Sequence, residues 1–248
     1  MSIKIENTKV FGWEAAIRGA RNPGNSWEES DSRFFDFGSG DLNHYHTLRG
    51  ESAEFPAPEI EIREGTHDLI GPKDYRLLMN QSKGGSEESK WRRMIHVQMD
   101  ITAPLYWWKE FDTYKVGTVS NSCSTMHMIH AKEFTPEDFS CEHLLSEPDC
   151  QLEAAGEKHT PSQVLQITID MLNTAREAFL KTQDKIYWWQ LIQLLPSSYN
   201  QHRTIDLNYE VLRGQYRERK DHKLDEWRIY CAFIRDLPYS EFITLNRP

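Results

Sequence analysis

The sequence is poor in cysteine, has no long apolar run and carries no excess of positive charge. Its four cysteines among 248 residues show no Cys-x-x-Cys spacing, and the first residues lack the apolar core of a signal peptide. We therefore expect a cytoplasmic protein with reduced thiols. No apolar run approaches the roughly 20 residues of a membrane helix, so we expect no membrane span. The formal net charge of -9 argues against nucleic acid or an anionic membrane as the main partner, but leaves room for a local basic pocket that binds a small anion.

Motifs for covalent catalysis and for a metal site are absent or incomplete. No serine lies in a Gly-x-Ser-x-Gly pattern, so a nucleophile elbow is not predicted. Cys123, His127 and His130 have a spacing that suits metal ligands, but zinc needs four ligands, and Cys141 and His143 lie further along the chain. We therefore predict no metal site and assign no catalytic residue.

The composition and length predict one folded domain. Apolar residues make up 38% of the chain and aromatic residues 12%, with eight tryptophans. A length of 248 residues suits a single domain over residues 1–248 with one main core. Residues 1–65 alternate short apolar pieces with Gly, Asn, Ser and acids, which predicts a loop-rich part with one or two short strands. Residues 131–158 are acidic and contain Pro136 and Pro148, which predicts a surface insertion with a short helix over 136–145.

The clearest strand covers residues 94–101, where apolar and polar side chains alternate. The side chains expected to face the core are those of Ile95, Val97, Met99 and Ile101, with His96, Gln98 and Asp100 on the other face. Thr102 is expected to cap, and Pro104 to open, a helix over residues 105–111. The strand and helix together would deliver the chain to a polar segment.

Helices are predicted along much of the second half. Thr160 and Pro161 form an N-cap and a first-turn proline at the start of the longest helix. Its expected buried stripe contains Val164, Ile167, Met171, Leu172, Ala175 and Phe179. Further helices are expected over residues 68–81, 186–195, 205–219 and 224–237. We expect the tryptophan pairs at 107–108 and 188–189 to lie in the core rather than to form a cofactor platform.

A run of small polar side chains occupies residues 114–127. Such hydroxyl and amide groups pack poorly in a core, because each would need a buried hydrogen-bond partner. We interpret the run as a loop whose donors face a phosphate or a nucleotide edge, with an ordinary serine-rich turn as the alternative. The candidate ligand-binding residues in it are Lys115, Ser120, Asn121, Ser122 and Ser124.

The C-terminal quarter is locally basic. Arg203 and Arg219 could converge on one ligand if the helix folds back on the preceding loop, whereas Arg217 and Arg219 cannot share a helix face. Arginine suits phosphate because its planar fork donates two hydrogen bonds at once. The alternative is a solvated helix face whose arginines pair with Glu210, Glu218, Asp221 and Glu226.

In its order of elements and in part of its motifs, the chain resembles the flavin-dependent thymidylate synthases. Their pattern Arg-His-Arg-x-x-Ser-x-Asn-x-x-Ser-x-Arg-Tyr follows a similar strand and helix. Laid on this pattern, Asn121 matches the family asparagine and Ser124 the second serine, with the spacing kept. The arginine-rich opening, however, falls on residues 114–116, the first serine on Val119 and the last arginine on Met126.

The second half is similar to the family in outline. The family has a Leu-Pro pair, an arginine soon after it, an asparagine at a helix start, a Leu-Arg pair and a Glu-Ile-Arg near the last helix. The corresponding places here hold Leu195-Pro196, His202 or Arg203, Asn208, Arg219 and Glu226-Trp227-Arg228, with one residue fewer between Arg219 and Glu226. The resemblance covers residues 68–240.

The resemblance implies an α+β fold in which a central antiparallel sheet packs with long helices. It also implies a homotetramer that holds FAD between subunits and moves a one-carbon unit from methylenetetrahydrofolate to a pyrimidine nucleotide, dUMP, with hydride from the reduced flavin. The cofactor-binding residues that it implies are Asn121, Ser122, Asn208 and Arg219, and the substrate-binding residues are Lys115, Ser120, Ser124, Arg203, Arg228 and Arg93.

The departures from the first motif bear on this function. Each charge-assisted hydrogen bond that the missing arginines and histidine would make to a ligand is worth about 1.5–3 kcal/mol. If Lys115, Arg92 and Arg93 do not replace them, flavin or dUMP binding in the usual way of the family should fail. Three functions therefore stay open. The first is a divergent flavin-dependent thymidylate synthase-like enzyme, the second a non-catalytic nucleotide-binding relative, and the third a structural or interaction protein that kept only the fold.

Overall fold

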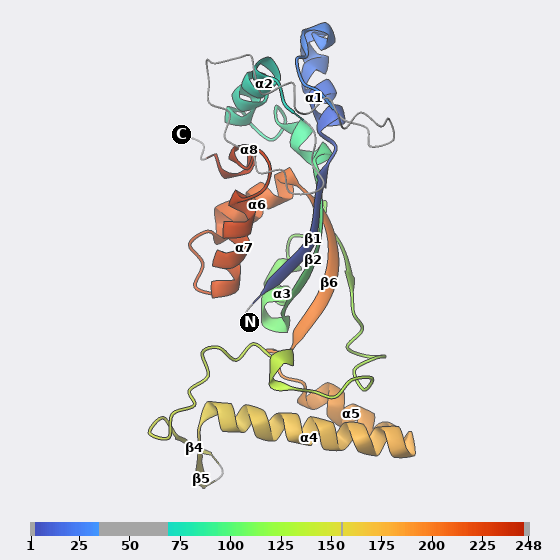
Figure 1. Ribbon diagram of the computed structural model, residues 1–248, viewed down its shortest axis with the longest axis vertical. Coiled ribbons are helices and arrows are strands. Elements are labelled where there is room, and N and C mark those ends of the chain that lie inside the picture. Colours follow the sequence, from blue (N-terminus) through green and yellow to red (C-terminus); the bar gives the residue numbers. More distant parts are fainter. Residues whose placement is uncertain (1–2, 35–68, 155, 246–248) are drawn as a thin grey trace, which may run out of the picture.

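A four-stranded antiparallel sheet forms the centre of the computed structural model, which describes residues 3–34, 69–154 and 156–245. The strands are β1 (Lys4–Phe11), β2 (His96–Pro104), β3 (Val119–Ser122) and β6 (Asn200–Asn208). Their order in the sheet is β1-β2-β6-β3, and every neighbouring pair is antiparallel. The predicted α+β class with a central antiparallel sheet is therefore confirmed (Figure 1).

The two central strands pair over their whole length. The register runs from His96 opposite Asn208 to Pro104 opposite Asn200. Val97, Met99 and Ile101 are buried on β2, as their alternation predicted. The strand is longer than expected, because Thr102 continues the pairing and its hydroxyl lies 3.0 Å from His202 Nδ1 instead of capping a helix. Pro104 is the N-cap of α3 (Leu105–Phe111) rather than its first residue.

Residues 200–208 correct the prediction of a helix over 205–219. They form strand β6, and helix α6 (Tyr209–Arg219) begins only after Asn208. The alternation of buried Ile205 and Leu207 with more exposed neighbours suits a strand. Backbone pairing with both β2 and β3 stabilises the strand over a helix. The other late helices, α7 (Asp225–Arg235) and α8 (Glu241–Thr244), lie with α6 to one side of the sheet in Figure 1.

The main core lies between the sheet and these helices. It is rich in large aromatic side chains, which include Trp107, Trp108, Phe111, Trp227 and Tyr230. The pair at 107–108 is fully buried, as expected. Trp189, by contrast, is 46% exposed, so the second tryptophan pair is not a core pair.

The N-terminal part contains more regular structure than predicted. The expected strand is present as β1, but helix α1 (Trp13–Arg21) follows it, with 3-10 turns at Asn22–Gly24 (η1) and Trp27–Glu29 (η2). Ala16, Ile17 and Ala20 form its buried stripe, and alanine favours a helix. The rest of the expected loop-rich region, 35–65, lies outside the described residues.

Helix α2 (Pro72–Lys83) replaces the helix predicted over 68–81. Its start is set by Pro72 in the first turn, while Leu69 pairs with Arg33 in an isolated bridge before it. The 3-10 helix η4 (Lys90–Met94) then leads into β2.

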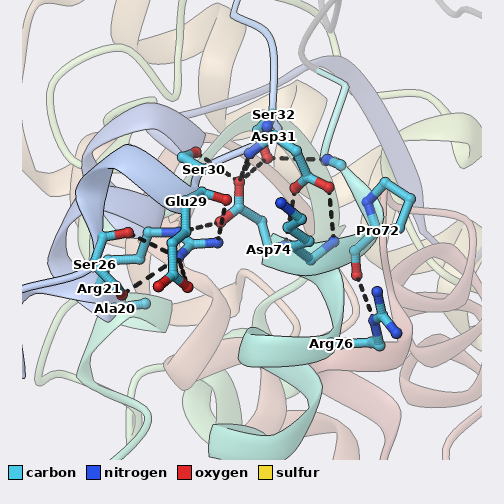
Figure 2. Close-up of polar contacts among 12 residues, drawn as sticks. Ala20, Arg21, Ser26, Glu29, Ser30, Asp31, Ser32, Pro72, Asp74 and Arg76 are labelled. Atoms are coloured by element: carbon cyan, nitrogen blue, oxygen red, sulfur yellow. Dashed lines mark hydrogen bonds and ion pairs between the residues drawn. The ribbon is translucent and has the colours of Figure 1, made fainter. Parts of the chain in front are cut away.

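A buried ionic network joins α1, α2 and the segment after η2 (Figure 2). Asp74 is fully buried and accepts a hydrogen bond from Arg21 Nε at 2.5 Å. It also accepts hydrogen bonds from the hydroxyls of Ser30 and Ser32 at 2.7 and 2.6 Å. Asp31 in turn accepts from the backbone nitrogens of residues 73 and 74 at the start of α2. The network satisfies a buried charge pair from several directions, as such a pair requires.

A second, smaller core lies at the other end of the molecule (Figure 1). Helices α4 (Pro161–Thr182) and α5 (Lys185–Leu194) enclose it together with buried Ile129, Phe134 and Phe139. The predicted start of α4 is confirmed, because Thr160 accepts from Gln163 N and forms a capping box with it.

The buried stripe of α4 is only partly as predicted. Leu172 and Ala175 are buried, and Ile169 joins them. Three of the other expected core residues are exposed, namely Val164, Ile167 and Met171. α5 and the small core cover one face of α4, so the apolar side chains elsewhere on α4 remain exposed to solvent.

The acidic segment 131–158 contains little helix. Only a 3-10 turn at Pro136–Asp138 (η5) is present where a helix over 136–145 was expected, and a hairpin of β4 (Leu152–Ala154) and β5 (Glu157–His159) ends the segment. Pro136 suits the first turn of this 3-10 helix.

No helix in the described ranges is long and apolar enough to cross a membrane. The four cysteines are free thiols, and Cys231 is the buried one among them.

Removing the Asp74 carboxylate should destabilise the protein strongly. Asp74→Ala removes the closest carboxylate of buried Arg21 and leaves it the longer pair with Glu29 at 3.7 Å, and breaking such a buried pair typically costs about 3–5 kcal/mol of unfolding free energy. Denaturant unfolding measures this, with Asp236→Ala, an exposed position after α7, as the control.

Acid unfolding gives a second readout of the same prediction. Burial would raise the pKa of Asp74, but hydrogen bonds from Ser32, Ser30 and Arg21 outweigh it and hold this pKa below its ordinary value. The carboxylate therefore stabilises the fold fully above the unfolded pKa of about 3.9, and this stabilisation is lost as pH falls through the lower folded pKa. The wild type should lose more stability on acidification than Asp74→Ala. An equal loss of stability in the wild type and in Asp74→Ala on acidification would contradict this stabilising role of the Asp74 carboxylate.

Candidate functional site

The last turn of α3 presents two carboxylates, and each binds one of the two arginines that we expected to converge. Arg203 Nη1 donates to Asp112 Oδ1 at 2.7 Å, and Arg219 Nη1 donates to Glu110 Oε2 at the same distance. Arg203 comes from β6 and Arg219 from the end of α6. The structure thus brings both arginines to one end of α3, although through acids that the sequence pattern had not singled out.

Glu110 is the centre of the larger part of this cluster. Its Oε2 also accepts a hydrogen bond from Trp227 Nε1 at 3.0 Å and lies 3.4 Å from His222 Nε2. Arg219 Nε donates to the Tyr114 hydroxyl at 2.9 Å. These contacts hold Arg219 firmly against α3.

Aromatic rings flank both guanidinium groups. The Arg203 Cζ atom lies 4.2 Å from the centroid of the Trp108 ring. The Arg219 Cζ atom lies 5.0 Å from the Trp227 ring and 5.7 Å from the Tyr114 ring. These distances are in the range of cation–π attraction, so the rings orient the arginines as the acids do.

Part of the predicted polar loop is an edge strand. Val119–Ser122 form β3, whose side chains are all exposed, and Ser122 lies opposite Arg203 while Asn121 lies opposite Thr204. Pairing with β6 satisfies one row of backbone groups while the hydroxyl and amide side chains stay in solvent, which explains why a polar run can be a strand. Ser120 and Ser122 therefore lie on the same face of the sheet edge as Arg203, whereas the side chain of Asn121 lies on the other face.

The residues that flank β3 have mostly local contacts. Ser124 accepts from the backbone nitrogens of Met126 and His127, so its hydroxyl closes a turn. Lys115 is exposed in the turn before Gly117, whose φ is +80°.

Asn208 lies at a helix start, as the family pattern implied. Its side-chain oxygen caps α6 by accepting from Glu210 N and Val211 N, both at 3.1 Å. A Cβ at Gly117 would lie 3.0 Å from Asn208 Nδ2, so the turn at 117 needs glycine for space as well as for its backbone angle. The side-chain oxygen of Asn208 is thus already used within the chain.

Among the described residues, Arg93 and Arg228 form no ion pair with Glu110 or Asp112. Arg93 is exposed in η4, before the opposite end of β2 from the one that leads into α3. Arg228 is exposed on α7 and binds Asp225. Arg92, a candidate replacement for the missing family arginines, is buried and donates to the Phe242 carbonyl oxygen, so it serves the core.

A buried acid that the sequence pattern had placed among surface partners lies next to the cluster. Glu226 accepts a hydrogen bond from the Tyr106 hydroxyl and is 4% exposed. Burial, and then this hydrogen bond, raise the pKa of Tyr106, so the phenol stays protonated as a donor. Its pairing was not visible from spacing, because 120 residues separate the two side chains.

Groups of three or more His, Cys, Asp or Glu side chains that could hold a metal ion are not found within the described ranges. Cys123, His127 and His130 therefore do not meet in a ligand set there.

Solved structures of one enzyme share this fold over nearly the whole chain. The flavin-dependent thymidylate synthase ThyX from Helicobacter pylori complexed with FAD and dUMP matches with a TM-score of 0.57 at 15% identity, covering 98% of this chain and 96% of that one. A second structure of ThyX from the same organism with FAD and dUMP gives the same score and identity, with 98% and 95% coverage. No protein-family model matches the chain, and no curated protein does. The likeness shows a shared fold.

Arg219→Ala tests how far this arginine serves the fold. If Arg219 served a ligand alone, its removal would weaken ligand binding and leave stability almost unchanged. The contacts to Glu110 and Tyr114 change that expectation, because losing hydrogen bonds to a partly buried charge costs about 1.5–3 kcal/mol of unfolding free energy.

The matched control is Arg217→Ala on the same helix. Arg217 is exposed and binds only its neighbour Glu218 among the described residues, so its removal should cost below about 1 kcal/mol. Equal effects of the two variants in denaturant unfolding would show that the Glu110 cluster does not stabilise the protein.

Proposed function

We propose that the protein binds FAD and a pyrimidine nucleotide such as dUMP, and transfers a one-carbon unit to the nucleotide with a folate as donor. The observation that carries this proposal is the near full-length fold match to ThyX with FAD and dUMP. Bound flavin would supply the hydride chemistry, and the protein's side chains would bind and orient the ligands.

The donors beside β3 fit a nucleotide ligand. Ser120, Asn121 and Ser122 present exposed hydroxyl and amide groups along a sheet edge, and such groups can hydrogen-bond to ribose hydroxyls or a base edge. Arg203 lies opposite Ser122, on the face that Ser120 and Ser122 share, and exposed Lys115 adds a positive charge. These residues are the proposed ligand contacts.

A second candidate is nucleotide binding without turnover, and the acid–arginine pairs favour it. Arg203 is held by Asp112 and Arg219 by Glu110, so a phosphate would have to compete with a carboxylate for each arginine. This arrangement supports ligand binding through β3 more strongly than it supports the usual arginine contacts of the family.

We further propose that the protein is a homo-oligomer, a tetramer by the same resemblance, and that α4 and α5 form the contact. Ile167 and Met171 on α4 are 51% and 53% exposed, and Ile186 and Trp189 on α5 are also open to solvent. Large apolar side chains gathered on two packed helices are typical of a surface that another subunit covers.

The visible absorption spectrum tests the main proposal. Protein incubated with FAD and desalted should retain a flavin band, and Asn121→Ala should weaken that retention, because the resemblance assigns this exposed amide to the flavin. Ser146→Ala, in the exposed part of the acidic segment, is the control and should retain FAD like the wild type.

If no flavin is retained, the effect of dUMP on the melting temperature distinguishes the remaining candidate functions. A colourless protein whose melting temperature rises with dUMP would favour binding without turnover. A colourless protein that dUMP does not stabilise would contradict both candidates and leave the structural or interaction function.

Light scattering tests the oligomer. Met171→Glu should reduce the molar mass in solution, because a charge on the proposed contact must be desolvated on association. Gln166→Glu adds the same charge on another side of α4 and should leave the mass unchanged. A monomeric wild type would refute the contact.

A further inference from the structure

Four residues of α6 and its C-cap share one helix face. Arg213, Tyr216, Arg217 and Lys220 stand at positions i, i+3, i+4 and i+7. Together with Ile243, Thr244 and Leu245 of the α8 segment, they line a pocket of about 330 Å³. This volume is at the lower end of the range for small-molecule sites, roughly 300–1,000 Å³. Three of the seven lining residues are cations and none is an acid.

Arg213 is the buried cation of this pocket. It is 9% exposed, and its Nε has no hydrogen-bond partner among the residues that the structure describes. Its ion pair with Glu210 is long, at 4.0 Å, and Glu210 is shared with Arg92 at 3.7 Å. A buried guanidinium with an unused donor is costly unless a ligand or water completes its hydrogen bonds.

The two outer cations pair with acids that are exposed to solvent. Arg217 binds Glu218, its neighbour in sequence, on the exposed surface, and Lys220 lies 3.9 Å from Asp221. Such exposed pairs are weak and exchange readily with solvent ions. The three cations can therefore turn to one anion without breaking a strong contact.

The helix dipole is a simpler explanation for cations at the end of α6, but it does not explain Arg213. Cations in the last turn stabilise the negative end of the helix dipole, which explains Arg217 and Lys220. Arg213 stands in the middle of α6 and is buried, where the dipole gives no such reason. A ligand accounts for all three.

This pocket is separate from the cluster at α3. Successive residues on a helix turn by about 100°, so Arg219 points to a different side of α6 from Arg213 and Arg217. Arg219 is held there by Glu110 and Tyr114, neither of which lines the pocket.

We propose that this pocket binds the phosphoryl group of a small phosphate ester. Arg213 and Arg217 donate to the phosphate oxygens through their planar forks, and Lys220 adds a third charge. Ile243 and Leu245, with the Tyr216 ring, contact the organic part of the ester. The site is additional to the proposed FAD and nucleotide site.

Calorimetric titration of the full chain with phenyl phosphate, inorganic phosphate and phenol tests the site. Phenyl phosphate should bind more tightly than inorganic phosphate, and phenol should not bind. The double variant Arg217→Gln/Lys220→Gln should weaken phenyl phosphate binding roughly tenfold to a hundredfold, because it removes two charge-assisted donors. Both residues are at the surface side of the pocket, so this variant keeps the core intact.

The matched control is Lys223→Gln/Arg235→Gln, which removes the same charge from exposed positions that do not line the pocket. An equal weakening in this control would mean non-specific attraction and would overturn the proposal. Absence of binding to both phosphate compounds would also overturn it, as would binding that is unchanged by Arg217→Gln/Lys220→Gln. Because the probes lack a base and a ribose, and because Asn121→Ala should leave them unaffected, failure here is distinguishable from failure of the nucleotide site.

Discussion

The pairing of β2 with β6 is the interaction that positions most of the other elements. It joins residues about a hundred positions apart in an unbroken register from His96 to Pro104. α3 follows directly from the end of β2, and α6 follows directly from the end of β6. Because the two strands are antiparallel, α3 starts at one end of the pair and α6 at the other, and α6 runs back far enough for Arg219 to reach Glu110. The cluster at α3 therefore exists only in the paired sheet.

Pairing between arginines and carboxylates has two consequences in this molecule. Buried or half-buried arginines here are usually matched by a carboxylate, as for Arg21 with Asp74 and Arg219 with Glu110. These pairs orient side chains and hold elements together, and they also reduce what the arginines can offer to a phosphate. Arg213 differs, since its nearest carboxylate is distant and one donor is unused among the described residues. The protein's shared fold with ThyX thus does not by itself decide which of its arginines meet a ligand.

Local signals predicted several elements well, and long-range pairing explains the misses. The alternation in β2 and the Thr160–Pro161 start of α4 could be identified because neighbouring residues carry the whole signal. The helix expected at 205–208 and the loop expected at 119–122 are strands because each pairs with a distant segment. The exposed apolar positions of α4 were assigned to the core for a related reason, since periodicity shows which residues share a face but not what covers it.

The order of the amino acids was enough to predict the α+β class, the main strand, the helix start marked by a cap and a proline, and the likeness to the flavin-dependent thymidylate synthases in order of elements. It also indicated that Arg203 and Arg219 could meet, but not that Asp112 and Glu110 would hold them. These partners, the edge position of β3 and the pocket beside Arg213 emerge only once the chain is folded. Charge pairing and burial depend on contacts between residues far apart in the chain, and no local pattern carries that information.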